Sequence, residues 1–516
     1  MHIEYQSLMD ARQHFKFKDR WKFFDADKDN LNIAYECIER HPKGDTAIRI
    51  QNDDGSRETY TFGELSQWTS QFANMLGRKG IGPGDRVAVV LPPCREFYIS
   101  FFGILKRGAV VVPSFPLLGP EGIEYRFETA GVKLAVINEE REKIIRPGLV
   151  SHIIKSEDLS GLIENEDDQY ATNTHADTLA VLQFSSGTTG QPKPLEYMHA
   201  AMTLTAVYVK FWFGLKKGDR FFCTSSPAWG HGIWYGTVSP LIFGNGIGAY
   251  SGKFDPEILL GALEKFKITT VSFIPRVYKM IMESEKLDNY RLQLRRLTYA
   301  GDSIDEDVVR YFKSKLGLDI GSCYGNTESG PVTLDYAYQD YTPRLGSAGV
   351  AVIGTKIGIL DDNGTPLPVG EIGEAAVWRK NGWAPIGDYG YLDEDGYFFP
   401  KGRSDDVIKS SGYRIGPFEI ENMLEKHPSV LKAAAVGSPH KERGEIIKAF
   451  IILNSGIKGS DALTAELQTL VKDRLSMHEY PKEIEYVDSL PETPDGKLQR
   501  KKLKLMEYTR KNDQAR

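Results

Sequence analysis

The stretch "TLAVLQFSSGTTGQPK" at residues 178–193 says most about how this chain folds. Its first part, 178–184, is largely apolar and predicts a strand. Its second part, 185–193, combines small hydroxyl residues with two glycines and ends in Lys193. Backbone N–H groups freed by glycine, hydroxyl donors and one ammonium group suit several phosphate oxygens at once. We therefore expect a strand that leads into a nucleotide-binding loop.

The spacing in this loop differs from that of the Walker phosphate loop, G-x-x-x-x-G-K-[ST]. Only two residues separate Gly187 from Gly190, and Pro192 and Pro194 flank Lys193. A kinase-like or GTPase-like loop is thus disfavoured. The remaining alternative is a flexible linker rich in Ser, Thr and Gly. The preceding strand and the isolated lysine favour a phosphate site over that alternative.

Length and composition predict a globular protein with more than one domain. The chain has 516 residues, 41% of them hydrophobic and 26% charged, with a formal net charge of -6. That charge does not indicate a nucleic-acid surface. No apolar run approaches the roughly 20 residues of a membrane helix, and the N-terminal stretch has no apolar core typical of a secretory signal. We expect a cytoplasmic protein without a membrane span, and the oligomeric state is left open.

The positions of the four cysteines also favour a cytoplasmic protein. Cys37, Cys94, Cys223 and Cys323 lie far apart, and the sequence has no CxxC or Cys/His cluster. Scattered thiols of this kind are typical of reduced cytoplasmic residues rather than of disulfides or zinc ligands.

Apolar runs alternate with helical patterns over the first part of the chain, at 86–91, 109–112, 134–137 and 179–184. This alternation is the signature of a mainly parallel sheet covered by helices. One helix is well marked, because Thr61 and Glu64 form a capping-box pattern ahead of an apolar face. The strand-then-loop pattern returns at 271–274 and at 297–303.

From about residue 345 to 400 the pattern changes to short β-like runs with the turn signals "DDNG" and "DEDG". After "GRSDD" at 402–406, helices and strands of a compact α+β domain follow. We predict an α/β protein with a large N-terminal domain, 1–402, made of two helix-covered sheets and a small β-rich lobe. A hinge at 403–405 and a C-terminal domain at 406–516 complete the predicted organisation.

Four separated motifs resemble those of the adenylate-forming acyl-CoA synthetase superfamily. They are "SSGTTGQPK" at 185–193, "YGNTE" at 324–328, "GRSDDVIKSSGYRIGPFEIE" at 402–421 and "PDGKLQRKKL" at 494–503. "SSGYRIGPFEIE" and "SPHKERGEIIKAF" make the chain similar to the acetyl-CoA and medium-chain acyl-CoA synthetase branch. The resemblance covers nearly the whole chain. It implies a mobile C-terminal domain and an enzyme that uses ATP, Mg²⁺ and coenzyme A to activate a small carboxylic acid.

The resemblance implies roles at the nucleotide. The expected ATP- and AMP-binding residues are Ser185, Ser186, Gly187, Thr188, Thr189, Gly190, Lys193, Gly301, Asp302, Tyr324, Gly325, Asn326, Thr327, Glu328, Asp388, Arg403 and Lys497. Within this set Tyr324 would stack on adenine, Glu328 would bind Mg²⁺, and Asp388 would receive the ribose hydroxyls. Asp302 stands where the family more often has Glu.

Lys497, Thr188 and Glu328 form the expected catalytic set. In the family, the lysine matched by Lys497 bridges the attacking carboxylate and the α-phosphate. An ammonium group at the meeting point of two anions stabilises that step more than the ground state. The alternative for Lys497 is a solvated basic tail, because several lysines and arginines follow it.

The C-terminal domain would then rotate about Asp405 for the second half-reaction. The residues matched to the CoA path are Ser411, Gly412, Tyr413, Arg443 and Lys472. Glycine at 412 has a physical reason, because a thiol-bearing arm must pass close to the backbone. The alternative for Arg443 and Lys472 is a solvated surface group, which is what an exposed cation usually is.

The acyl-substrate residues are expected to be Trp229, His231, Gly325 and Arg414. Acetyl-specific relatives have a tryptophan where this chain has Gly325, which favours an acid larger than acetate. A packed aromatic cluster is the alternative for Trp229 and His231. The chain lacks a longer family segment before Gly387, has Ile386 in place of the usual Thr, and continues unusually after Lys193, through Pro194 and Tyr197.

The leading hypothesis is an ATP-dependent acid:CoA ligase. One alternative passes the acyl group to the phosphopantetheine of an acyl carrier protein or releases the adenylate. Amino-acid adenylation is disfavoured, because "SSPAWGHGIW" at 225–234 has no acidic residue to pair with an α-ammonium group. A binding protein on a degenerate ligase fold would lack a catalytic group, whereas Glu328 and Lys497 are present.

Overall fold

The structure is a computed structural model that describes residues 4–185, 192–326, 329–403, 406, 408–410, 413–440, 444–475, 480–492 and 498–514. The chain forms two compact units. The first comprises Met1–Leu345 with Val352–Gly354, and the second comprises Gly346–Ala351 with Thr355–Arg516. The hinge at 403–405 and the domain boundaries drawn around it stay predictions.

The first unit contains a sheet in the order β6-β5-β3-β4-β7-β8. Its strands are β3 (Arg86–Val90), β4 (Val110–Pro113), β5 (Val132–Ile137), β6 (His152–Lys155), β7 (Leu179–Ser185) and β8 (Lys193–Met198). All neighbours run parallel except the last pair, β7 and β8. The apolar runs at 86–91, 109–112, 134–137 and 179–184 thus form the buried centre of a largely parallel sheet, as predicted.

A second sheet in this unit contains the order β14-β13-β12-β11-β9-β10-β1-β2. Its strands are β1 (Thr46–Asn52), β2 (Arg57–Thr61), β9 (Phe221–Cys223), β10 (Ile247–Ser251), β11 (Thr270–Phe273), β12 (Arg296–Ala300), β13 (Ile320–Asn326) and β14 (Gly330–Leu334). The central strands run parallel, whereas β2 and β14 pair antiparallel with their neighbours. One large apolar core lies against this sheet, around Leu260, Tyr278 and Phe312.

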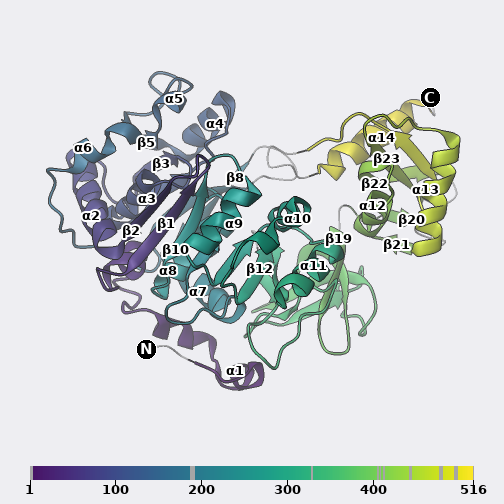
Figure 1. Cartoon of the computed structure of the whole chain (residues 1–516), viewed down its shortest axis with the longest axis horizontal. Helices are drawn as coiled ribbons and strands as arrows, with labels where there is room; N and C mark the ends of the chain where they lie inside the picture. Colours follow the sequence, from purple (N-terminus) through teal and green to yellow (C-terminus); the bar gives the residue numbers. More distant parts are fainter. Residues whose placement is uncertain are drawn as a thin grey trace. The chain divides into compact units, whose positions relative to one another are not determined.

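Helices cover these sheets (Figure 1). They are α1 (Leu8–His14), α2 (Phe62–Arg78), α3 (Arg95–Arg107), α4 (Pro120–Ala130), α5 (Glu139–Glu142), α6 (Leu159–Ile163), α7 (Ala201–Trp212), α8 (Ser239–Ile242), α9 (Pro256–Lys265), α10 (Pro275–Ser284) and α11 (Glu306–Leu316). The predicted capping box begins α2: the Thr61 side chain accepts from the Glu64 N–H, and the Glu64 carboxylate accepts from the Thr61 N–H.

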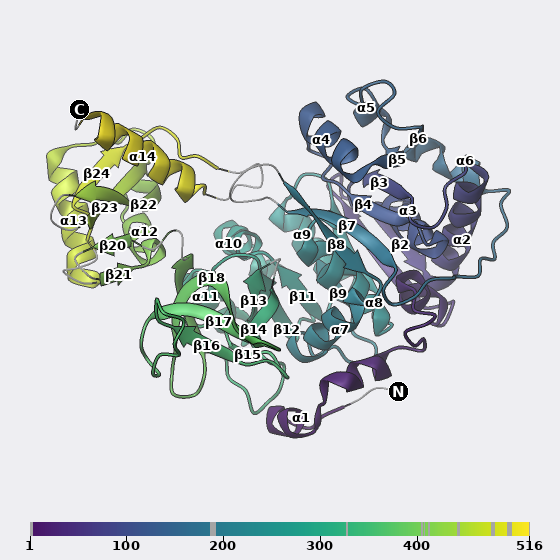
Figure 2. The same ribbon diagram turned by 180° about the vertical axis from the view of Figure 1, so that it is seen from behind.

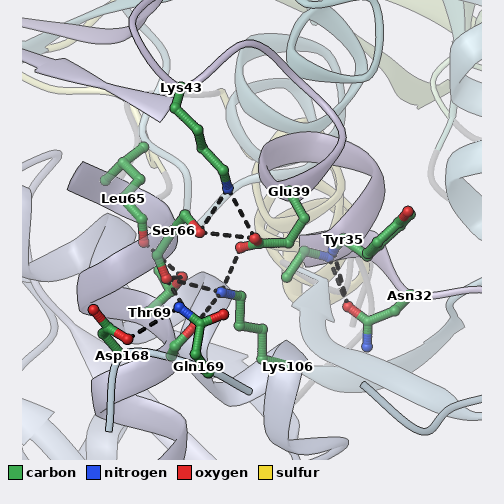
Figure 3. A network of polar contacts seen from close by, with 12 residues as sticks. Asn32, Tyr35, Glu39, Lys43, Leu65, Ser66, Thr69, Lys106, Asp168 and Gln169 are labelled. Atoms are coloured by element: carbon green, nitrogen blue, oxygen red, sulfur yellow. Dashed lines mark hydrogen bonds and ion pairs between the residues drawn. The ribbon is translucent and has the colours of Figure 1, made fainter. Parts of the chain in front are cut away.

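A buried lysine joins α2 and α3 to the π-helical segment Tyr35–Glu39 (Figure 3). Lys106 on α3 lies 2.5 Å from Glu39 Oε1 and donates to Ser66 O at 3.0 Å and to Ser70 Oγ at 2.8 Å. Burial lowers the pKa of Lys106, and the Glu39 carboxylate opposes that effect. With three oxygen acceptors the ammonium group is well satisfied, so the network fixes how these helices meet.

The second unit contains an antiparallel sheet in the order β16-β17-β18-β19. Its strands are β16 (Ile357–Leu360), β17 (Gly373–Arg379), β18 (Gly382–Leu392) and β19 (Phe398–Arg403), and a short strand β15 (Val350–Ala351) lies nearby in the chain. The predicted turns are present: Gly364 N–H donates to Asp361 O at 3.1 Å, and Gly396 N–H donates to Asp393 O at 3.0 Å. Both glycines have positive φ, near 80°, as such turns require.

The rest of this unit has a sheet in the order β21-β20-β23-β22, with β24 paired to β23. Its elements are β20 (Ile408–Ser410), β21 (Tyr413–Ile415), α12 (Pro417–Glu425), β22 (Val430–His440), β23 (Gly444–Leu453), α13 (Asp461–Arg474), β24 (Glu483–Tyr486) and α14 (Arg500–Gln514). The first helix of this predicted α+β domain is α12, whose Ile420 and Leu424 side chains are buried in the core of this part.

The α/β fold class predicted from the sequence is confirmed. The four cysteines are free thiols, in agreement with their spacing. Within the described ranges, no helix combines the length and the apolar character needed to cross a membrane.

Candidate functional site

The two ends of the stretch at 185–193 lie opposite one another on paired strands. β7 and β8 run antiparallel, with Ser185 opposite Lys193 and Phe184 opposite Pro194 (Figure 2). β8 is the edge strand of its sheet, a position that tolerates a proline. The hydroxyl of Tyr125 on α4 donates to Pro192 O at 3.0 Å. The residues after Lys193, which depart from the family pattern, therefore form a regular edge strand.

Two predicted nucleotide segments emerge at one edge of the second sheet. β12 and β13 are parallel neighbours, with Ala300 opposite Cys323. The chain then enters Gly301–Asp302 after β12, and Tyr324–Asn326 at the end of β13. The carboxyl ends of parallel strands are where α/β proteins bind ligands. The fold thus brings together segments that lie apart in the sequence.

The "YGNTE" motif begins on a second hairpin, between β13 and β14, with Asn326 opposite Gly330. Asn326 Oδ1 accepts from the Ser329 N–H at 2.7 Å and from its hydroxyl at 2.6 Å. A Cβ atom at Gly325 would lie 2.1 Å from Gly330 O. The hairpin itself therefore requires glycine at 325, independently of any acyl pocket.

Trp229, predicted for the acyl site, lies directly against the loop that follows β12. Gly301 has φ +100°, and a Cβ atom there would lie 2.6 Å from Cη2 of the Trp229 ring. The indole thus packs on the backbone of Gly301, next to Asp302. A predicted acyl residue and a predicted nucleotide loop are direct neighbours.

His231 is held between two serine hydroxyls. Its Nδ1 lies 2.8 Å from Ser225 Oγ, and its Nε2 lies 2.8 Å from Ser272 Oγ on β11. Burial lowers the pKa of His231 to about 4, so the ring is neutral near pH 7. A neutral ring donates one of these bonds and accepts the other, so both nitrogens are already engaged.

The rings around His231 form an aromatic cluster. The centroids of Trp229, Trp212 and Tyr235 lie 6.0, 6.2 and 6.4 Å from that of the imidazole. The cluster considered as the alternative from the sequence is therefore present. Contact of Trp229 or His231 with an acyl group stays a prediction.

Three polar residues at this edge were not singled out from the sequence: Gln183, Ser225 and Ser272. Gln183 on β7 donates through Nε2 to Ala228 O at 3.0 Å, which ties β7 to the loop that carries Trp229. Its Oε1 is buried and has no hydrogen-bond partner within the described part of the chain. A buried Gln in an apolar strand was the available signal.

In the second unit, two predicted ribose contacts are opposite one another. Asp388 on β18 pairs in register with Arg403 on β19, and Asp388 is 4% exposed. Directly opposite residues in an antiparallel pair have Cβ atoms about 5 Å apart. Positions separated by a hairpin in the sequence are thus neighbours on one face of this sheet.

The predicted CoA residues that the structure describes lie on separate elements. β20 and β21 form a hairpin with Ser410 opposite Tyr413, and Arg414, which was predicted for the acyl substrate, follows on β21. Lys472 is exposed on α13. The structure does not assign either segment a ligand.

The remaining predicted site residues lie outside the described residues. They are Ser186, Gly187, Thr188, Thr189, Gly190, Thr327, Glu328, Asp405, Ser411, Gly412, Arg443 and Lys497. Across the part of the chain that is described, no group of three His, Cys, Asp or Glu side chains is arranged to hold a metal ion. The predicted magnesium ligand, Glu328, is not among the residues described.

Two family models match the chain. The model described as AMP-binding enzyme matches residues 35–382, and the model described as AMP-binding enzyme C-terminal domain matches residues 419–497. Together they reach into both units and cover the motifs at 185–193 and 324–328 in full, and those at 402–421 and 494–503 in part.

The chain is 32% identical to acetyl-coenzyme A synthetase of Bacillus subtilis, over 92% of this chain and 91% of that protein. It is 34% identical to mitochondrial acyl-coenzyme A synthetase ACSM3 of Rattus norvegicus, over 88% of this chain and 86% of that protein. Among solved structures, the anthranilate CoA ligase AuaEII in complex with anthranoyl-AMP is 26% identical, with a TM-score of 0.84 over 96% of this chain and 100% of that chain.

Proposed function

Since the chain belongs to the AMP-binding enzyme family of ATP-dependent acid–CoA ligases, we propose that it activates a carboxylic acid larger than acetate and transfers the acyl group to CoA. In the first half-reaction a carboxylate oxygen attacks the α-phosphorus of ATP, and pyrophosphate leaves with the electrons of the broken P–O bond. In the second, the CoA sulfur attacks the acyl carbon and AMP leaves.

One observation carries this proposal: the contact between Trp229 and Gly301 at the carboxyl edge of the second sheet. It joins the loop proposed for the acid to the loop proposed for adenine. Adenylation needs the carboxylate and the α-phosphate within reach of each other. An edge where the two loops touch meets that requirement.

The proposed nucleotide roles follow this placement. Tyr324 stacks on adenine, Gly301 and Asp302 form the wall beside it, and Asp388 with Arg403 receives the ribose. Ser185, Thr188 and Lys193 stabilise the pyrophosphate as it leaves. These roles are supported by the hairpins that carry the residues and by the family pattern.

Magnesium is proposed as the metal, with Glu328 as its protein ligand. Mg²⁺ bound to a nucleotide commonly uses one or two carboxylates together with the phosphate oxygens. A single acidic residue at the end of the "YGNTE" motif is compatible with that donor set. When bound, the ion would neutralise charge on the phosphates.

The proposed preference for a larger acid rests on the lack of a side chain at Gly325. Acetyl-specific relatives are expected to close their pocket with a tryptophan at this position. Because the β13–β14 hairpin also requires glycine here, a panel of acids tests the preference better than a substitution at 325 would. The panel covers acetate, straight-chain, branched and aromatic acids.

CoA is the proposed acceptor, through Ser411, Gly412, Tyr413, Arg443 and Lys472. Every relative described above is named as a coenzyme A synthetase or ligase. A carrier-protein thiol is the other acceptor that the sequence leaves open. Acid-dependent pyrophosphate release that yields no thioester with CoA would favour the carrier protein.

The deciding experiment measures pyrophosphate release across the panel, with and without CoA. We expect release that depends on the acid, and thioester formation when CoA is added. Lys497→Ala should lower adenylation at least about 100-fold and spare thioester formation from supplied acyl-adenylate. Lys501→Ala, which removes an exposed cation on α14, is the matched control. Lack of acid-dependent release from every acid would contradict the proposed function.

A further inference from the structure

Arg500 begins α14, shortly after Lys497 in the chain. Its guanidinium group faces two carboxylates. Nε donates to Glu421 Oε1 on α12 at 2.8 Å, and Nη2 makes a second bond to Glu421 Oε2. Nη1 lies 3.7 Å from Asp406 Oδ2. Two parallel bonds from one guanidinium to one carboxylate fix distance and orientation together.

The carboxylate that receives Arg500 is itself held firmly. Glu421 is 4% exposed, and its Oε1 also accepts from the Ala435 N–H on β22 at 2.8 Å. The guanidinium is therefore tied through Glu421 to the central sheet of this part of the second unit. A flexible surface pair would not provide such a fixed reference.

The two ends of segment 493–497 are also bonded to each other. Glu492 and Leu498 form an antiparallel bridge. The Gln499 N–H donates to Pro491 O at 2.8 Å, and its Nε2 donates to Glu492 O at 3.0 Å. Glu492 and Leu498, the residues on either side of the segment, thus lie side by side, and Arg500 follows two residues after Leu498. Arg500 is therefore attached to the paired ends of this segment through Gln499.

Asp406 adds a second connection. It directly follows Asp405, the residue proposed as the hinge. The Arg500 guanidinium therefore faces both Asp406, next to the proposed hinge, and Glu421 on α12. Arg500 itself stands at the start of α14, the helix that follows Lys497 in the chain. A rotation about the hinge would be passed to the Lys497 segment through this group.

We propose that Arg500 is a positioning residue for adenylation, which holds the segment carrying Lys497 in register with the C-terminal domain. The proposal rests on the proposed function, in which Lys497 meets the carboxylate and the α-phosphate. Misplacing a catalytic group by about 1 Å can cost about 100-fold in rate. Arg500 acts through Lys497 and does not touch substrate.

The competing explanation is that Arg500 only stabilises α14. The helix has separate anchors at its far end, where the buried Glu507 accepts from Ser438 Oγ at 2.8 Å and from Lys448 Nζ at 3.1 Å. Arg510 also pairs there, with Glu485 and Glu507. These contacts hold α14 when Arg500 is replaced, so the two roles are separable.

The test compares Arg500→Gln with a control, Arg510→Gln. Arg510 is on the same helix, α14, and its guanidinium also contacts two carboxylates, those of Glu485 and Glu507. Arg500→Gln should lower the kcat of adenylation by about tenfold to about 100-fold, leave the KM for ATP within about twofold, and spare thioester formation from supplied acyl-adenylate. Arg510→Gln should change neither half-reaction. Arg500→Lys keeps the charge without the paired geometry and should fall between wild type and Arg500→Gln.

A double-mutant cycle with Lys497→Ala separates positioning from stability. If Arg500 acts through Lys497, adding Arg500→Gln to Lys497→Ala causes no further loss of adenylation. Equal losses in both half-reactions, or the same loss from Arg510→Gln, would overturn the inference. Wild type without acid-dependent pyrophosphate release would instead overturn the proposed function. Active wild type with an unchanged Arg500→Gln would overturn this inference alone.

Discussion

Two regions of the molecule use different interactions to hold their polar groups. At the carboxyl edge of the second sheet, His231, Ser225 and Ser272 are joined by bonds between neutral groups. In the α+β part of the second unit, Lys448 lies 2.8 Å from Glu485 and 3.1 Å from Glu507, with its side chain 4% exposed. One region is neutral and the other is charged.

The difference matches what each region must do. The acid proposed to bind beside Trp229 and His231 carries a negative charge, and a buried carboxylate in contact with it would repel it. Neutral hydroxyls, amides and a neutral imidazole avoid that repulsion. The ions around Lys448 can be buried because each of them has a partner of opposite charge. The two regions should therefore respond differently to substitution and to pH.

The largest expected effect is the loss of the buried lysine. Lys448→Met would remove the ammonium partner of Glu507, which is 2% exposed and keeps its contacts with Arg510 and Ser438. Removing one member of a buried ion pair costs about 3–5 kcal/mol of unfolding free energy, and because these two contacts remain we expect a loss near the lower end, about 3 kcal/mol. Urea unfolding at about pH 7 would measure this loss.

The double variant Lys448→Met with Glu507→Gln is the matched control. It removes both charges, so we expect it to be more stable than Lys448→Met alone. A loss below about 1 kcal/mol for Lys448→Met would show that this region does not depend on its charges.

The next effect concerns pH and tests the neutral region. Burial lowers the pKa of His231 to about 4, so between about pH 6.5 and about pH 4 the unfolded chain binds a proton there that the folded chain does not. Stability therefore falls as the pH is lowered through this window. Each pKa unit corresponds to about 1.4 kcal/mol, so His231 contributes up to about 3 kcal/mol to the decline.

His231→Asn should flatten the pH dependence of the unfolding free energy in that window. Burial also lowers the pKa of His41 to about 4 and that of His199 to about 3, so part of the slope remains. In the charged region, burial raises the pKa of Glu483, but Lys511 and Lys448 outweigh that effect and keep it below its usual value. An unchanged slope in His231→Asn would show that the folded structure does not lower the pKa of His231.

A third prediction concerns the contact between the two proposed loops. Gly301→Ala places a methyl group 2.6 Å from the Trp229 ring, at φ +100°. We expect a loss of about 1–3 kcal/mol and a raised KM for ATP. Gly317→Ala is the control, because Gly317 has φ +69° with nothing within 4 Å. Equal effects of the two substitutions on KM would show that the Trp229 contact is unimportant for binding.

The sequence predicted well those features that depend on neighbours in the chain. The capping box at Thr61 and Glu64, the "DDNG" and "DEDG" turns and the apolar strands of the first unit all follow from local pattern. The strand β8 was missed, because Pro194 and the charged residues Lys193 and Glu196 do not resemble a strand. Only its place at the edge of the sheet makes that sequence compatible with pairing.

The site was less predictable where it depends on distant parts of the chain. Ser272 lies 41 residues from His231, and no local pattern connects the two. The register that places Asp388 opposite Arg403 depends on how β18 and β19 pair. The family pattern named these two residues, whereas their adjacency in space required the hairpin.

The smallest expected effect separates the two serines that hold His231. Ser272 is fully buried, whereas Ser225 is partly exposed in the loop that carries Trp229. Water can replace the Ser225 hydroxyl but not that of Ser272. Ser225→Ala should therefore cost about 1 kcal/mol or less, and Ser272→Ala about 1–3 kcal/mol, because the latter leaves a buried imidazole nitrogen unpaired.

Activity should show the opposite order. Ser225 lies in the loop proposed to receive the acid, so Ser225→Ala should raise the KM for the acid more than Ser272→Ala does, with kcat and the KM for ATP nearly unchanged. Steady-state kinetics on the preferred acid would measure this split. The opposite outcome is that both substitutions raise the KM for the acid in proportion to their loss of stability. His231 and its two serines would then serve packing alone, and the neutral and charged regions would differ in how they are stabilised and not in function.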